Sequence, residues 1–123
     1  MPSDFQATIQ TLKDLVAAFA RERDWEQFHS PKNLSMALAV EVAELMELFQ
    51  WKTEKESREV GSDPVLRQRV AEELADIAHF LFNLCNQLDV DLTSAFIGKL
   101  EQNVAKYPAD RVRGKSAKYT DYR

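Results

Sequence analysis

The sequence predicts an all-α fold, a four-helix bundle-type subunit, and three observations support this. The chain has 123 residues, the usual length of one domain. It contains 3 Gly and 4 Pro, which is few for the many turns of a β-sandwich. Apolar residues recur at spacings of three and four over most of its length, as they do in amphipathic helices. We therefore expect helices that pack their apolar faces together.

The first two helices follow from their apolar patterns and start signals. The first is expected from Asp4 to Arg23, where apolar residues form one stripe. The second is expected from Pro31 to Glu56, because Ser30 can act as the N-cap and proline suits the first helical position. Its middle, LSMALAVEVAELMELFQW, is apolar on nearly every face. Such a helix needs cover on all sides, which predicts a central place in the bundle or a subunit interface.

The third and fourth helices are predicted in the same way. Asp63 and Pro64 repeat the pattern of a cap followed by proline, and the third helix should run from there to about Leu88. Asp91 can cap the fourth helix, which should end before Pro108 because proline disfavours a helical conformation in the residue before it.

The periodicity ends at residue 107, so we expect a helical domain over residues 1–106 and an irregular tail over residues 107–123. The tail has five basic and two acidic residues, a charge of +3, which leaves −7 on the rest of a chain whose net charge is −4. A basic tail on an acidic body can fold onto an anionic ligand or a neighbouring subunit. A solvated terminus is the alternative, and the sequence leaves both open.

Composition disfavours several classes of function. A net charge of −4 and a pI near 5.2 argue against binding to a nucleic acid polymer, because such proteins are usually basic. The single cysteine, Cys85, rules out an intramolecular disulfide and a Cys-rich zinc site. The first residues do not resemble a secretory signal, and no apolar run has the length that spans a bilayer. We expect a cytoplasmic protein with no membrane partner.

Two pairs of carboxylates lie within the apolar stripes. Glu41 and Glu44 are three residues apart and share a helix face, and Glu73 and Asp76 repeat that spacing on the next helix. Such pairs are common on solvated faces, but a charge in apolar surroundings must be paired, neutralised or bound to a metal. Antiparallel packing of the two helices can bring the pairs opposite each other. Mg²⁺, which prefers carboxylate oxygens, would relieve their repulsion.

These residues resemble the metal motif of the MazG-like family of all-α nucleoside triphosphate pyrophosphohydrolases, which is E-x-x-E, a spacer, then E-x-x-D. EVAE at 41–44 and ELAD at 73–76 match it residue for residue. Further segments resemble the family's dCTP pyrophosphatase branch: ERDWEQFHSPKNL at 22–34, EVAELMELFQWK at 41–52, a K-x-x-x-N-x-x-x-YP pattern from Lys99 to Pro108, and RGKSAKYTD at 113–121.

The resemblance implies hydrolysis of a deoxynucleoside triphosphate between its α and β phosphates, which yields a monophosphate and pyrophosphate. It implies Mg²⁺, for which Mn²⁺ is a possible substitute, held by Glu41, Glu44, Glu73 and Asp76. Of these, Glu41 and Glu44 are the candidate catalytic residues. It also implies a homotetramer built as a dimer of dimers, with sites formed between subunits. That assembly agrees with a second helix that is apolar on nearly every face.

The candidate phosphate contacts are Lys52, Lys99 and Lys106. Lys52 lies three turns beyond Glu41 if the second helix is continuous, and Lys99 and Lys106 are seven residues apart on the fourth helix. Solvated lysines are the alternative. No P-loop, nucleophile elbow or HExxH motif is present, which agrees with a reaction that needs positioning and charge compensation.

The candidate base and sugar contacts rest on the resemblance. Trp25 and Trp51 match pocket tryptophans, and Asn103 matches an asparagine that reads the nucleotide. His29 is either a ligand or a loop-fixing residue. Two departures remove polar groups: Phe80 stands at a tyrosine position of the branch, and Val16 stands at a histidine position. We therefore expect a less strict preference for dCTP. We expect His79 and Cys85, on the apolar third helix, to be core residues.

We thus expect Mg²⁺-dependent house-cleaning hydrolysis of dCTP or a modified, for example 5-substituted, deoxycytidine triphosphate. A dUTP-specific or broad-specificity pyrophosphohydrolase is one alternative. The other is a non-catalytic nucleotide-binding helical module that oligomerises. The intact carboxylate set argues against the second, because loss of activity would release those costly charges.

Overall fold

The computed structural model describes residues 1–122 and contains helices but no strands within them. The all-α prediction is confirmed. The α-helices are α1 (Ile9–Glu22), α2 (Pro31–Glu47), α3 (Glu54–Arg58), α4 (Pro64–Leu88), α5 (Leu92–Lys106) and α6 (Ala109–Val112). Short 3₁₀ turns lie at η1 (Glu26–Phe28), η2 (Val60–Ser62) and η3 (Tyr119–Tyr122). The chain divides into two compact units, Met1–Asp89 and the part from Val90 onward, which are described separately.

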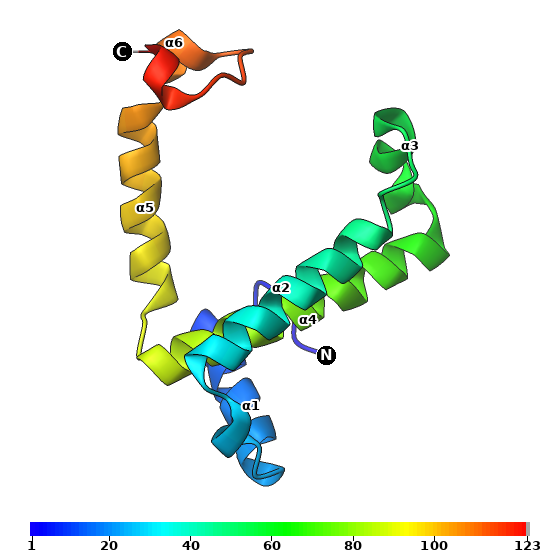
Figure 1. Cartoon of the computed structure of the whole chain (residues 1–123), viewed down its shortest axis with the longest axis vertical. Coiled ribbons are helices and arrows are strands. Elements are labelled where there is room, and N and C mark those ends of the chain that lie inside the picture. The colour runs from blue at the N-terminus through cyan, green and yellow to red at the C-terminus, as the bar shows by residue number, and fades with distance from the viewer. Residues whose placement is uncertain (123) are drawn as a thin grey trace. The chain divides into compact units, whose positions relative to one another are not determined.

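The N-terminal unit is organised around α4. Figure 1 shows α2 lying alongside α4 and running in the opposite direction, and α1 also packs on α4. Apolar side chains buried between these helices form a small core: Val16, Ala20, Leu34, Phe82 and Cys85. The prediction that Cys85 is a core residue is therefore confirmed. Because α2 and α4 are antiparallel neighbours, residues near their middles face each other.

The three predicted N-caps are all present. The Ser30 Oγ accepts a hydrogen bond from the Asn33 N–H at 3.1 Å, and α2 begins at Pro31. The Asp63 carboxylate accepts from the N–H of Val65 at 3.0 Å. The Asp91 carboxylate accepts from the N–H of Ser94 at 2.8 Å and starts α5. These bonds satisfy N–H groups that have no partner within the helix, which is why the starts could be predicted.

The first helix begins later than predicted, at Ile9 instead of Asp4. Thr8 is its N-cap: its Oγ1 accepts from the Thr11 N–H at 3.0 Å, and the Thr8 N–H donates to the Thr11 hydroxyl at 3.3 Å. This reciprocal pair sets the start of the helix.

The second helix ends earlier than predicted, at Glu47 instead of Glu56. A turn follows, and a separate short helix, α3, begins after Thr53. The Thr53 Oγ1 accepts from the Glu56 N–H at 3.1 Å, while the Glu56 carboxylate accepts from the Thr53 N–H at 3.2 Å. This T-x-x-E capping box was a start signal in the sequence, and the continuing apolar pattern obscured it.

The C-terminal unit consists of α5, α6 and η3. α5 ends before Pro108, as predicted. The stretch expected to be irregular contains a short helix, because the Pro108 carbonyl accepts hydrogen bonds from the N–H groups of Arg111 and Val112. Gly114 follows with φ of +76°, a conformation that glycine adopts without strain. Among the described residues no helix combines the length and apolarity needed to cross a membrane.

Candidate functional site

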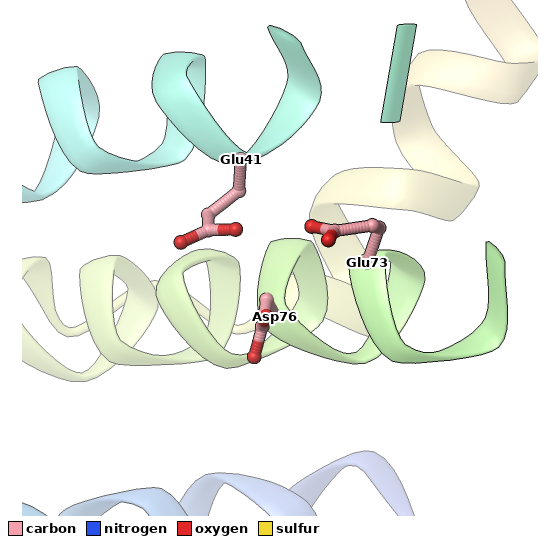
Figure 2. Close-up of side chains that lie close together, drawn as sticks. All are labelled: Glu41, Glu73 and Asp76. Atoms are coloured by element: carbon pink, nitrogen blue, oxygen red, sulfur yellow. The ribbon is translucent and has the colours of Figure 1, made fainter. Parts of the chain in front are cut away.

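Three carboxylates from two helices meet at the centre of the N-terminal unit. Figure 2 shows Glu41 projecting from α2 toward α4, which carries Glu73 and Asp76. One carboxylate oxygen from each of the three lies within 4.8 Å of the others. The antiparallel contact of α2 with α4 produces this arrangement, because it sets the middle of one helix against the middle of the other.

Two of these carboxylates have buried oxygens without a partner. The Oε2 atoms of Glu41 and Glu73 are shielded from solvent and accept no hydrogen bond. Burial, followed by the proximity of Glu44, Asp76 and Glu73, raises the pKa of Glu41 to about 7. Burial and the Glu44 carboxylate also raise the pKa of Glu73. Without a cation, Glu41 and Glu73 therefore hold their protons to a higher pH than ordinary glutamates do.

This donor set fits a hard divalent cation. Carboxylate oxygens are the ligands that Mg²⁺ prefers, and a cation would satisfy the two buried oxygens and offset the repulsion. Glu44, the fourth predicted ligand, lies outside the group of three whose oxygens converge. It is exposed, yet close enough to Glu41 and Glu73 to raise both of their pKa values.

The raised pKa of Glu41 predicts how stability depends on pH when no metal is bound. The folded state holds this proton up to about pH 7, whereas the unfolded chain loses it near pH 4.5. Between these values the folded state binds more protons, so stability should fall as the pH rises through this window. We expect urea unfolding in EDTA to show this fall, and the dependence should be weaker in Glu41→Gln, which has no proton to lose at this position. Identical pH profiles for the two proteins would contradict the assignment.

A hollow of about 540 Å³ with aromatic walls adjoins the carboxylate cluster, and Glu41 and Asp76 belong to both. Its walls come from α1, the turn after α1, α2 and α4: Leu15, Val16, Phe19, Trp25, Glu41, Asp76, His79 and Phe80. The Phe19 ring makes edge contacts with Trp25 and with His79, at centroid distances of 5.7 and 5.4 Å. A flat ring is the kind of ligand that such walls accept, because aromatic faces stack on planar groups.

Two predicted base contacts, Trp25 and Phe80, line the hollow, whereas His29 does not. The Nδ1 of His29 lies 3.0 Å from the Nδ2 of Asn83, a buried residue of α4. Because an amide nitrogen only donates, His29 accepts this bond through an unprotonated Nδ1. The bond ties the segment after η1 to α4, which matches the loop-fixing alternative.

Two other predicted contacts of the N-terminal unit, Lys52 and Trp51, do not line this hollow. Because α2 ends at Glu47, the helical register that aligned Lys52 with Glu41 does not exist, and that part of the prediction is wrong. Lys52 instead lines a separate hollow of about 480 Å³ with Glu56, Glu59 and Asp63. Trp51 is 89% exposed. Lys99, Asn103 and Lys106 lie on α5, in the C-terminal unit, and remain predictions.

Sequence reasoning missed Phe19 and His79 as wall residues of the hollow. Both belong to apolar stripes, so a place in the core was the simpler interpretation. His79 is only half-buried, and it lies beside the carboxylates. One signal was available: His79 follows Asp76 at a spacing of three, the same spacing that pairs Glu73 with Asp76 on one face.

The comparisons identify the class of all-α protein in which an E-x-x-E helix packs against an E-x-x-D helix. The family profile described as MazG-like matches residues 36–122, which include both carboxylate pairs. The chain therefore belongs to the MazG-like family.

The chain is also similar to several proteins of known name. The chain is 46% identical over 116 residues to dCTP pyrophosphatase 1 of Homo sapiens, an alignment covering 94% of this chain and 68% of that protein. It is 45% identical to dCTP pyrophosphatase 1 of Rattus norvegicus, with the same coverage. The crystal structure of a pyrophosphatase from Archaeoglobus fulgidus DSM 4304 superposes with a TM-score of 0.76 at 34% identity, covering 88% of this chain and 99% of that one.

Proposed function

We propose that this chain is a Mg²⁺-dependent pyrophosphohydrolase that converts dCTP, or a modified deoxycytidine triphosphate, to the monophosphate and pyrophosphate. One observation carries the proposal: Glu41 and Asp76 belong both to the carboxylate cluster and to the wall of the aromatic hollow. A nucleotide can therefore place its phosphates at the cluster and its base in the hollow. Family membership and the 46% identity to a dCTP pyrophosphatase support the house-cleaning hydrolysis of deoxynucleoside triphosphates.

The residues that would hold the cation are Glu41, Glu73 and Asp76, with Glu44 beside them. Bound there, Mg²⁺ would supply charge compensation for the triphosphate and acidify a water molecule. Glu44 is exposed and lies outside the converging group, which makes it the candidate to accept the proton of the attacking water. The bond between the α and β phosphates then breaks, and no protein nucleophile is needed.

The hollow would hold the base and sugar. Trp25 offers an aromatic face, and stacking on such a face contributes roughly 1–3 kcal/mol per base. Val16 and Phe80 add apolar wall beside it, so much of the hollow selects for a flat ring without reading its edge. This wall also suits a substituent on the ring, in agreement with modified pyrimidines as substrates.

We further propose that the active form is a tetramer, a dimer of dimers. Along α2, Met36, Val40 and Met46 are 58%, 56% and 64% exposed, and Trp51 just beyond the helix is 89% exposed. Exposed apolar side chains along one helix are typical of a subunit interface. A second copy that covers α2 would also give Trp51 the neighbours that a base-pocket residue needs.

The basic tail, residues 107–123, is proposed to cover the triphosphate or the adjoining subunit. A chain that ends at Pro108 should then have a higher KM for dCTP, or form an oligomer of fewer subunits in sedimentation equilibrium, than the full chain. The reason is that the tail carries a local charge of +3 against an anionic substrate or an acidic subunit. An unchanged KM together with an unchanged number of subunits would mean that the tail is a solvated end.

The proposed activity is tested by pyrophosphate release from a panel of deoxynucleoside and nucleoside triphosphates with and without Mg²⁺. Preference for dCTP or a 5-substituted dCTP is the expected result. Preference for dUTP, or similar rates on all bases, would favour the alternative specificities. Tight binding of a triphosphate without turnover would favour the non-catalytic module.

A further inference from the structure

His79 occupies an unusual place for a histidine on an apolar helix. It lies on α4 three residues after Asp76, about 4.5 Å further along the helix axis, and forms part of the wall of the hollow. Its imidazole is held edge-on by two phenyl rings, Phe19 at 5.4 Å and Phe80 at 5.7 Å between centroids. Those contacts fix the ring plane while leaving the residue only half-buried.

The chemistry of the wall singles out this ring. Apart from the carboxylates of Glu41 and Asp76, the lining side chains are hydrocarbons or aromatic rings, and Trp25 adds one N–H donor. Burial lowers the pKa of His79, and the nearby His29 lowers it further, while Asp76 opposes the change. A neutral imidazole offers one donor and one acceptor. His79 is therefore the side chain of this wall that can present both to an uncharged ligand.

The neighbouring polar residue on α4 cannot serve instead. Asn83 lies one turn beyond His79, but it is 2% exposed and its amide is engaged with His29 at 3.0 Å. The α1 side of the hollow contributes Leu15, Val16 and Phe19, which have no polar side-chain atoms. Among the lining residues that α4 contributes, His79 is therefore the one whose neutral side chain can hydrogen-bond the edge of a base.

We propose that His79 is a specificity-determining residue that hydrogen-bonds the edge of the pyrimidine held in the hollow. The inference rests on the proposed nucleotide substrate and deepens it. With the phosphates at the carboxylate cluster, the base would enter the hollow, whose α4 wall runs from Asp76 to His79 and Phe80. A pocket that hydrogen-bonds its ligand discriminates far more strongly than an apolar one, so this single ring restores a polar contact to a wall that Val16 and Phe80 leave apolar.

The direct test uses wild-type protein and needs no turnover. The chain has 2 histidines, so protein labelled with ¹⁵N-histidine gives two sets of imidazole signals, and loss of one set in His79→Gln assigns them. Saturation with dCMP should shift the ring nitrogen signals of His79, because hydrogen bonding changes their shielding. Saturation with 2-deoxyribose 5-phosphate, which has the sugar and phosphate without the base, should leave them in place. Unmoved His79 signals in the presence of bound dCMP would overturn the proposal.

Kinetics supply the second test. In His79→Phe, which keeps a ring for Phe19 and Phe80 to contact, kcat/KM for dCTP should fall about tenfold, the usual effect of one lost hydrogen bond. In His79→Gln, which retains a donor and an acceptor, most of the loss should be recovered. The same substitutions should lower kcat/KM for 2-deoxyribose 5-triphosphate, which has no base, much less than kcat/KM for dCTP.

The two proposals fail in different ways. Equal losses of kcat/KM for dCTP and for the base-free triphosphate would mean that His79 acts on the fold or on the carboxylates. The role proposed for His79 would then be wrong, while the proposed hydrolase activity would be unaffected. A wild-type protein that is folded but turns over no triphosphate and binds no dCMP would overturn both. Circular dichroism of each variant separates a folding defect from a lost contact, and the labelled wild-type protein is free of that ambiguity.

Discussion

Replacing Glu41 by Gln is expected to abolish pyrophosphate release from dCTP while the helical fold remains. Glu41 is the α2 member of the three-carboxylate group, and its Oε2 is buried with no partner. Glutamine has nearly the same shape as glutamate but no charge, so the substitution removes the negative charge that α2 contributes to binding the cation. Loss of residues that merely orient metal ligands costs 10–100-fold, so loss of a ligand should cost at least about a hundredfold in kcat. Pyrophosphate release measured at saturating Mg²⁺ checks this.

The matched control is Glu47→Gln. Glu47 is on the same helix, is exposed and lies outside the carboxylate group, so the identical substitution should leave turnover near the wild-type rate. Asp76→Asn, on α4, should repeat the loss seen for Glu41→Gln. The far-ultraviolet circular dichroism of all three variants should match wild type. Wild-type turnover by a folded Glu41→Gln protein would remove that residue from the mechanism.

Removal of divalent metal should have an effect as large. In EDTA the three carboxylates face each other without a counter-charge, and the phosphates of dCTP would approach a negative surface. We expect turnover to fall to background in EDTA and to return when Mg²⁺ or Mn²⁺ is added in excess. The helices have caps and core contacts that do not involve the carboxylates, so the protein should stay folded throughout.

Thermal unfolding provides the control for metal removal. A ligand that binds only the folded state raises its stability with concentration, so Mg²⁺ should raise the melting temperature of wild type at pH above 7. The rise in melting temperature should be smaller in Glu41→Gln than in wild type, and in Glu47→Gln it should equal that of wild type. An equal rise in all three proteins would place the bound cation somewhere other than the carboxylate group.

Local signals in the sequence predicted where three of the helices, α2, α4 and α5, begin. Ser30, Asp63 and Asp91 each start a helix with a side-chain hydrogen bond only two or three residues away, so nothing beyond the local sequence was needed. The end of α2 was missed because two local signals conflict there. The apolar pattern continues through FQW, whereas Thr53 and Glu56 form a capping box that begins a new helix.

The carboxylate site could be predicted and the hollow could not. Helix spacing and the antiparallel packing of adjacent helices predicted that the two pairs would meet, and three of the four carboxylates, Glu41, Glu73 and Asp76, do converge. The hollow depends on how α1 crosses α4, which brings Phe19 within 5.4 Å of His79 although they are far apart in the sequence. Periodicity marks both as core residues, and only the packed structure shows that a space is left between them.

Product analysis by ³¹P NMR tests the central proposal most directly. Protein is incubated with dCTP and Mg²⁺, and a parallel sample contains EDTA. We predict the phosphorus signals of dCMP and pyrophosphate in equal amounts in the first sample and unchanged dCTP in the second. Signals of dCDP and inorganic phosphate, or equal turnover with and without EDTA, would contradict a metal-dependent cleavage between the α and β phosphates.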